Sequence, residues 1–161
     1  MNKLIDEARE FALKKHEGQM YGKNEPYSIH LEDVARRVAE DGLSDVHVAV
    51  AWLHDILEDT DVLYDELEAL FGHEVAKAVY YMTKVKGEMY ADYLECVSVN
   101  PISVVVKIHD LKSNLGAAER KKKGKLASRY INALEYLECH LPQNFIDIDF
   151  SKSPPKVTKI K

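Results

Sequence analysis

Apolar residues recur at every third or fourth position along most of the chain, a spacing at which side chains share one face of an α-helix. The pattern predicts helices over residues 2–16, 28–40, 44–60, 61–70, 73–84, 90–99, 100–115 and 126–140. Alternation of apolar and polar residues, which is typical of a half-buried strand, is found only around residues 145–150. We therefore predict an all-α fold with polar loops over residues 18–27 and 116–125.

The length of 161 residues suits one domain with a single core. Asn100 followed by Pro101 is a typical helix start, and Thr60-Asp61 is predicted to cap the short helix that follows it. We predict a helical domain over residues 1–141 and a tail over residues 142–161. The tail has weak apolar periodicity, which indicates a partly extended or disordered segment.

The segment from Ala51 to Thr60 carries an adjacent His54-Asp55 pair and, one helical turn later, Glu58 and Asp59. At 100° per residue these four side chains span an arc of about 140°, opposite the apolar stripe of the same helix. Carboxylates beside a core cost several kcal/mol unless something positive satisfies them. Imidazole and carboxylate together suit a divalent cation such as Mn²⁺ or Fe²⁺, with Zn²⁺ as a further possibility.

Two ligands from one helix do not complete a metal shell, so other segments must contribute. Asp110 follows the apolar run from Val104 to Ile108, where a carboxylate needs a partner. His30 lies in the first turn of its predicted helix. Each has a simpler explanation on its own, because Asp110 can pair with Lys107 and a lone helical histidine is usually structural. Residue spacing leaves both alternatives open.

The net charge of −5 argues against a nucleic-acid binder, whose affinity would rest on a basic face. An anionic small molecule is still compatible with it, because a metal and local lysines reverse the charge within a pocket. Cys96 and Cys139 lack metal-site spacing and are expected to be reduced. With no signal-type segment and no apolar run of about 20 residues, we expect a cytoplasmic protein without membrane contact.

Three strings of the sequence, in this order, resemble motifs of one enzyme family. They are residues 15–30 (Lys-His-Glu-Gly-Gln through Glu-Pro-Tyr to His30), residues 54–60 and residues 107–114. The set resembles the H…HD…D signature of HD-domain metal-dependent phosphohydrolases, and still more the hydrolase domain of RelA/SpoT proteins and the single-domain small alarmone hydrolases. The resemblance implies an all-α helical bundle with a metal site between its helices. It also implies Mn²⁺-dependent removal of the 3′-pyrophosphate of guanosine tetra- and pentaphosphate.

The resemblance assigns roles to individual residues. It implies four ligands for Mn²⁺, or for another divalent metal such as Fe²⁺, Zn²⁺ or Mg²⁺: His30, His54, Asp55 and Asp110. Glu58 and Asp59 are implied to orient and deprotonate the attacking water. The residues implied to contact a nucleotide substrate are Asn114, Tyr130, Lys107, Tyr21 and Lys86.

Several positions depart from the family pattern. Met20-Tyr21 stands where the family usually has an arginine that packs on the purine, and Tyr21 can stack on a base without bringing charge. Asn24, Leu31 and His109 replace a glycine, a proline and an alanine. Two alternatives therefore stay open: an HD phosphohydrolase acting on a deoxynucleotide, a nucleoside monophosphate or NADPH, and a catalytically silent nucleotide-binding regulator. The Glu58-Asp59 pair argues against the silent regulator, and the oligomeric state is left open.

Other polar residues receive structural interpretations. The run from Arg120 to Lys125 is predicted to be a solvated loop, with guidance of a polyphosphate as the alternative. His47 is expected to be exposed, with a supporting role at the metal site as the alternative. His16 and His73 are expected to be structural, and Trp52 to be part of the core.

Overall fold

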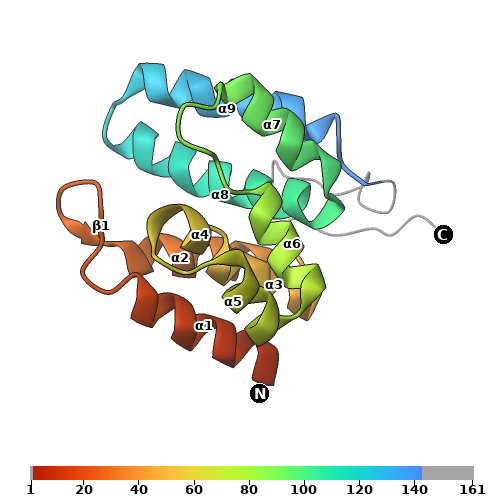
Figure 1. Cartoon of the computed structure of the whole chain (residues 1–161). Helices are drawn as coiled ribbons and strands as arrows, with labels where there is room; N and C mark the ends of the chain where they lie inside the picture. The colour runs from red at the N-terminus through yellow and green to blue at the C-terminus, as the bar shows by residue number, and fades with distance from the viewer. Residues whose placement is uncertain (1, 143–161) are drawn as a thin grey trace.

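The computed structural model describes residues 2–142, and the fold is a helical bundle with one small hairpin (Figure 1). The elements in chain order are α1 (Lys3–Lys15), β1 (Met20–Tyr21), β2 (Glu25–Pro26), α2 (Tyr27–Glu40), α3 (Asp45–Leu53), α4 (Ile56–Asp59), α5 (Tyr64–Phe71), α6 (His73–Tyr81), α7 (Tyr90–Val99), α8 (Pro101–Arg120) and α9 (Gly124–Glu138). The all-α prediction is confirmed. The antiparallel hairpin pairs Tyr21 with Glu25 inside the segment predicted to be a loop.

Side-chain caps explain where several helices begin. The side chain of Asn2 accepts a hydrogen bond from the Ile5 amide at the start of α1, and the Ser44 side chain accepts one from the His47 amide at the start of α3. Asn100 caps α8 in the same way, with Pro101 in its first turn, as the sequence predicts.

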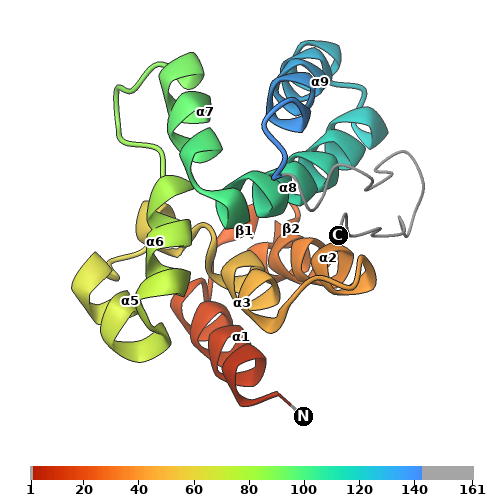
Figure 2. The ribbon, with the colours of Figure 1, turned by 90° about the vertical axis from the view of Figure 1, so that its right-hand side faces the viewer.

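The buried apolar residues form two clusters rather than one. The larger cluster contains side chains of α1, α2, α3, α5 and α6, including Trp52, which is part of the core as predicted. The smaller cluster lies among α7, α8 and α9. Helix α8 belongs to both, because Val106 packs in the first and Ile108 in the second. Figure 2 shows α8 between the two halves, with α7 and α9 diverging above it.

The helix predicted over residues 44–60 is interrupted at the motif itself. Helix α3 ends at Leu53, and the short α4 begins only at Ile56. In a continuous helix the Asp55 amide would bond to the Ala51 carbonyl, but the His54 ring occupies that carbonyl, with Nδ1 2.6 Å from the oxygen. The prediction that these four side chains share one arc of a continuous helix is therefore wrong, because the break separates His54 and Asp55 from Glu58 and Asp59.

Several predicted boundaries also differ. Thr60-Asp61 does not cap the next helix: Thr60 Oγ1 bonds to the Ile56 carbonyl and the Val62 amide, and α5 starts at Tyr64. Helix α6 stops three residues earlier than predicted, at Tyr81. Helix α8 runs through Gly116 to Arg120 because Ala117 and Ala118 on its next turn are buried.

The division into a domain over residues 1–141 and a tail stays a prediction. Residues 143–161, which include the possible strand at 145–150, lie outside the described residues. Within the described part of the chain, no helix combines the length and the apolar character needed to cross a membrane.

Candidate metal centre

Four of the predicted site residues come together between α2, the break after α3, and α8. One possible ligand atom from each of His30, His54, Asp55 and Asp110 lies within 4.8 Å of the others. The side chains of both histidines and of Asp110 are almost fully buried, and Asp55 is slightly more exposed. Segments 80 residues apart in the sequence thus build one cluster, while the metal-binding roles of its members stay a prediction.

The environment of His54 fits a bound cation. Its Nδ1 donates to the Ala51 carbonyl, which leaves Nε2 with a lone pair in the neutral ring. That buried Nε2 has no hydrogen-bond partner among the described residues, yet it lies 2.9 Å from Asp55 Oδ2 and 3.2 Å from Asp110 Oδ1. A lone pair facing two carboxylates is unfavourable unless a positive charge lies between them. The donor set therefore fits a divalent metal ion.

The same geometry perturbs proton binding. Burial by itself would lower the pKa of His54, but the charges of Asp55 and Asp110 outweigh it and raise that pKa well above its usual value. Burial would raise the pKa of Asp110, but Lys107 and His54 hold it well below its usual value. The cluster thus attracts a cation, whether a proton or a metal.

Asp110 serves two groups through its two oxygens. Its Oδ1 lies 2.9 Å from His30 Nε2, and its Oδ2 lies 2.6 Å from Lys107 Nζ. The two alternatives that spacing left open, a metal-site carboxylate and an ion pair with Lys107, are therefore compatible. Asn114, one turn later on α8, donates from Nδ2 to Asp110 Oδ1 at 3.3 Å.

His30 is oriented by a chain of groups on its other side. Its Nδ1 lies 3.1 Å from Ser113 Oγ, and the Ser113 hydroxyl hydrogen-bonds to Asp33. Burial would raise the pKa of Asp33, but hydrogen bonds from Ser113, Arg37 and Arg36 outweigh it and lower the pKa to about 2. Such outer partners fix the tautomer and ring orientation of a metal-binding histidine.

Glu58 and Asp59 on α4 are each held by a neighbouring segment. Glu58 Oε1 accepts a hydrogen bond from the Lys84 amide at 2.7 Å, and Asp59 Oδ2 accepts one from Gln19 Nε2 at 2.9 Å. Gln19 Oε1 is in turn 2.8 Å from His16 Nδ1. Burial is the main cause that raises the pKa of both carboxyl groups. Raised pKa values bring carboxylates closer to the range useful for accepting a proton.

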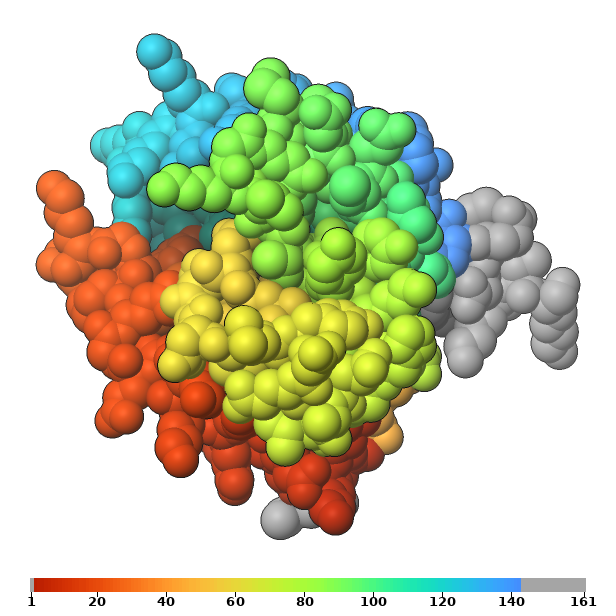
Figure 3. Space-filling model, in the orientation of Figure 1, coloured from red at the N-terminus to blue at the C-terminus, as the bar shows by residue number. Residues whose placement is uncertain are grey.

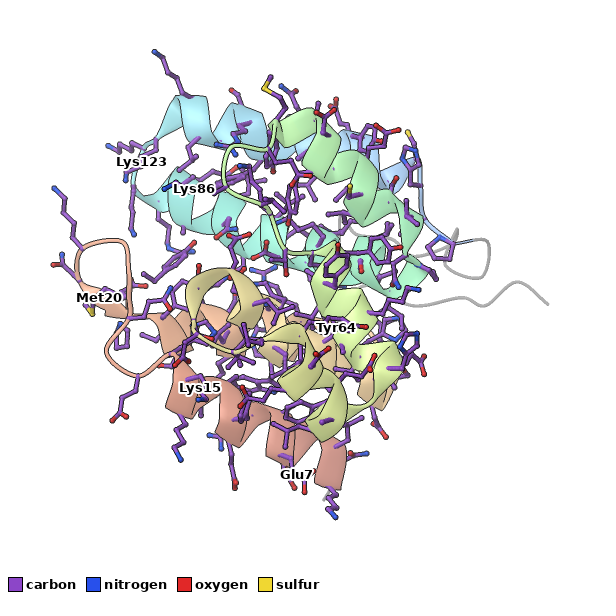
Figure 4. The ribbon with its side chains drawn as sticks, in the orientation of Figure 1. Glu7, Lys15, Met20, Tyr64, Lys86 and Lys123 are labelled. Carbon is purple, nitrogen blue, oxygen red and sulfur yellow. The ribbon has the colours of Figure 1, made fainter. Side chains whose placement is uncertain are left out.

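The residues predicted to contact substrate divide into two groups. Tyr21, Asn114 and Tyr130 line one cavity of about 150 Å³, and the Tyr21 hydroxyl donates to Asn114 Oδ1 at 2.6 Å. Lys107 lies beside Asp110 instead, with Nζ 5.3 Å from the Tyr93 ring centre. Lys86 is exposed on the loop before α7 and is not among the residues that line the cavity (Figure 4).

Sequence reasoning missed three supporting residues. Tyr27 donates a hydrogen bond from its hydroxyl to Asp55 Oδ2 and stacks on His16, with ring centres 5.2 Å apart. Ser113 contacts His30, and Gln19 contacts Asp59. Tyr27 and Gln19 belong to the motif strings, and Ser113 lies one helical turn after Asp110, so motif membership and helical spacing were the available signals.

His47 was predicted to be exposed, and that is wrong. The residue is buried, and its Nδ1 lies 2.6 Å from the Ser44 hydroxyl. Burial lowers the pKa of His47 to about 4. His47 therefore supports the start of α3, where its ring contacts Ser44, the residue that caps the helix.

Comparison with known proteins shows where similar sequences occur. The HD domain family matches residues 8–92, which include His30, His54 and Asp55. A guanosine-3′,5′-bis(diphosphate) 3′-pyrophosphohydrolase of Aquifex aeolicus (strain VF5) is 35% identical over 149 residues, covering 86% of this chain and 20% of that protein. A protein of the same name from Vibrio cholerae serotype O1 is 35% identical over 145 residues, covering 81% of this chain and 20% of the relative. The chain thus spans about a fifth of the length of these relatives.

A solved structure shares the fold. It is described as a metazoan ortholog of SpoT that hydrolyzes ppGpp and plays a role in starvation responses. The TM-score is 0.68 with 22% sequence identity, over 88% of this chain and 93% of the other. Since the family match itself extends over more than half of the residues, this chain belongs to the HD domain family.

Proposed function

We propose that this protein is a metal-dependent hydrolase that removes the 3′-pyrophosphate of guanosine tetra- and pentaphosphate. The observation that carries the proposal is the buried His54 Nε2, which lies 2.9 Å from Asp55 Oδ2 and 3.2 Å from Asp110 Oδ1 in a cluster that attracts a cation. Under this proposal His30, His54, Asp55 and Asp110 hold the metal. We propose Mn²⁺ as the native ion, because two imidazoles and two carboxylates form a ligand set of intermediate hardness.

Different residues of this chain have different roles in the proposed reaction. A divalent cation, when bound, supplies Lewis-acid activation of water and offsets negative charge on phosphoryl oxygens. Glu58 and Asp59 orient the attacking water and accept its proton, since their carboxylates are fixed by Lys84 and Gln19. Lys107, paired with Asp110, adds a positive charge at the side of the site where phosphate arrives.

The substrate assignment rests on the relatives and on the cavity beside the metal centre. Relatives that align with most of this chain are named for hydrolysis of guanosine-3′,5′-bis(diphosphate) at its 3′ side. The cavity with Asn114, Tyr130 and Tyr21 offers hydrogen-bonding groups and aromatic rings, which suit a nucleoside. Tyr21 supplies the stacking surface that an arginine supplies in the family pattern.

The test is release of pyrophosphate from guanosine tetraphosphate by metal-stripped protein, with and without Mn²⁺, followed by anion-exchange chromatography. We expect Mn²⁺-dependent conversion to the 5′-diphosphate. Glu58→Gln is the matched control, because the glutamine keeps an oxygen that accepts the Lys84 amide but cannot accept a proton from water. Absence of conversion in protein that binds one metal per chain would reject this substrate and favour a deoxynucleotide, a nucleoside monophosphate or NADPH. Absence with every nucleotide would favour a silent regulator.

A further inference from the structure

The basic turn between α8 and α9 is exposed, as predicted for a solvated loop, and it lies beside the hairpin. Lys122 adopts a left-handed backbone conformation with φ of 54°, which reverses the chain between the two helices. Lys121 and Lys123 on either side of it line a cavity of about 360 Å³ together with Lys23 and Glu25 of the hairpin. Figure 4 shows Lys123 on this turn above the hairpin that carries Met20.

Lys121 is fitted closely against the hairpin. Its Nζ lies 5.4 Å from the Tyr21 ring centre, a cation–π distance. A Cβ atom on Gly22 would lie 2.7 Å from that same Nζ, and Gly22 has a positive φ of 65°. The positive φ favours a glycine at this position for the turn, whereas the Lys121 ammonium, at the end of a flexible side chain, can shift away from a Cβ atom.

Charge in the cavity is predominantly positive. Three lysines face one glutamate, and across residues 2–142 the ion pairs involve other cations: Lys3, Lys15, Arg36, Arg37, Lys107 and histidines. Lysines that line one cavity without carboxylate ion pairs repel each other, and a polyvalent anion relieves that repulsion.

The basic cavity adjoins the cavity lined by Tyr21, Asn114 and Tyr130, which we call the nucleoside cavity. The two share Gly22, Lys121 and Lys123 as lining residues. At the inner end, Asn114 hydrogen-bonds to Asp110 of the candidate metal centre. Figure 3 shows a recess at this place, where the hairpin, α4 and α8 meet. The nucleoside cavity therefore has lysines at one side and, at the other, Asn114, which is bonded to a member of the candidate metal centre.

We propose that Lys23, Lys121 and Lys123, the lysine cradle, bind the 5′-polyphosphate of the substrate while its 3′-pyrophosphate lies at the metal centre. The inference rests on the proposed function, because it assigns the second anionic end of the same nucleotide. Ammonium groups on flexible stems bind phosphates as point charges and adapt to chains of different length. The cradle selects nucleotides phosphorylated at both ends and favours guanosine pentaphosphate over the tetraphosphate.

The kinetic test compares wild type with the Lys121→Ala/Lys123→Ala double variant on guanosine tetraphosphate, guanosine pentaphosphate and guanosine 3′-diphosphate. The ratio of kcat/KM for the tetraphosphate to that for the 3′-diphosphate should fall about tenfold in the double variant, mainly through KM, because two phosphate contacts are lost. Lys125→Ala is the control: it removes one lysine charge from the nearby start of α9, outside the cradle, and its ratio should equal that of wild type. An unchanged ratio in the double variant would overturn the cradle.

A second measurement separates the cradle from the proposed function. Inorganic tripolyphosphate is titrated by calorimetry into metal-free wild type, the double variant and Lys125→Ala at two salt concentrations. We expect the double variant to bind about tenfold more weakly, with a smaller loss of affinity at high salt than wild type. If wild type hydrolyses no alarmone but this dependence is found, the proposed function fails and the cradle stands. Equal affinities in wild type and the double variant would identify the turn as solvated.

Discussion

The ring of Tyr21 lies face to face with that of His30, with ring planes 1° apart and centres 4.8 Å apart. The same tyrosine donates its hydroxyl proton to Asn114, which is bonded to Asp110. One hairpin side chain therefore touches His30, a member of the candidate metal centre, and Asn114, a neighbour of another member. Tyr21 links the nucleoside cavity to the cluster, so its ring and its hydroxyl are expected to have separable effects.

Replacement of Tyr21 tests that separation. Tyr21→Phe keeps the ring against His30 and loses the bond to Asn114, so we expect KM to rise a few-fold with metal affinity unchanged. Tyr21→Ala also exposes His30, and we expect weaker metal binding by about tenfold. Metal titration of stripped protein and steady-state kinetics give both quantities. Equal effects of the two variants on metal affinity would contradict a role for the ring.

Glu58→Gln should separate chemistry from metal binding. Loss of a proton acceptor is expected to lower kcat by about 10²- to 10³-fold. The metal content should stay at the wild-type value if the ligands are His30, His54, Asp55 and Asp110, as proposed. Elemental analysis of the purified variant provides the check. A variant that has lost its metal would mean that Glu58 belongs among the ligands.

The pH dependence of kcat/KM should show an acidic limb set by the carboxylates of α4. Burial raises the pKa of Glu58 and of Asp59 in the folded protein. A base must be deprotonated to act, so activity should decline at a higher pH than the ordinary value of about 4.3 for a glutamate. The profile is measured with saturating metal and with metal content determined at each pH. A limb at or below pH 4 would exclude these groups as the base.

Asp33 should contribute stability that depends on pH. Its pKa is lowered to about 2 in the folded state, so the contribution is present above the unfolded pKa of about 3.9 and is lost as pH falls toward 2. We expect Asp33→Asn to lower the free energy of unfolding by about 1–2 kcal/mol at pH 7. The difference from wild type should vanish near pH 2 in urea titrations.

The control for that experiment is Asp61→Asn. Asp61 is 90% exposed and lies 3.9 Å from Lys15, an ion pair in which water screens most of the attraction. Its replacement should change stability little at either pH. A loss at pH 7 as large as that of Asp33→Asn would show that removal of any acidic charge has this effect.

Metal removal should destabilise the fold through His54. A ligand at 100 times its Kd adds about 2.7 kcal/mol to stability, so stripping should lower Tm and excess Mn²⁺ should restore it. His54→Ala should lose this response. His47→Ala is the matched control, because His47 is also a buried histidine but lies in the first turn of α3 and bonds to Ser44. Its Tm should be lower than that of wild type and still rise with Mn²⁺.

The helical class and the grouping of site residues were accessible from sequence for different reasons. Apolar periodicity of 3.6 residues is a local property, so the helices were predictable except that α3 and α4 were expected to be one helix. The grouping of His30, His54, Asp55 and Asp110 relied on resemblance to a family, since helical spacing relates only His54 and Asp55 to each other. The family motif could relate residues that lie far apart in the sequence, which helical spacing cannot do.

The break at His54-Asp55 was not predictable from periodicity, because the residues on both sides continue a helical pattern. At the break the His54 ring competes for the Ala51 carbonyl, a local contact that apolar periodicity does not encode. The length of α8 escaped prediction for a similar reason: Gly116 favours a helix end locally, but burial of Ala117 and Ala118 continues the helix. The burial of His47 likewise depends on packing that no local pattern encodes.

The shared position of α8 in two apolar clusters has a consequence for tolerance to mutation. Val106 anchors the helix in one cluster and Ile108 anchors it in the other, while Asp110 lies one turn further along. A large-to-small replacement in either cluster opens a cavity beside α8. The helix then shifts, and Asp110 moves with it although the fold survives. Replacements in either apolar cluster, far from His30 and His54, are therefore expected to lower the activity of the site before the fold itself is lost.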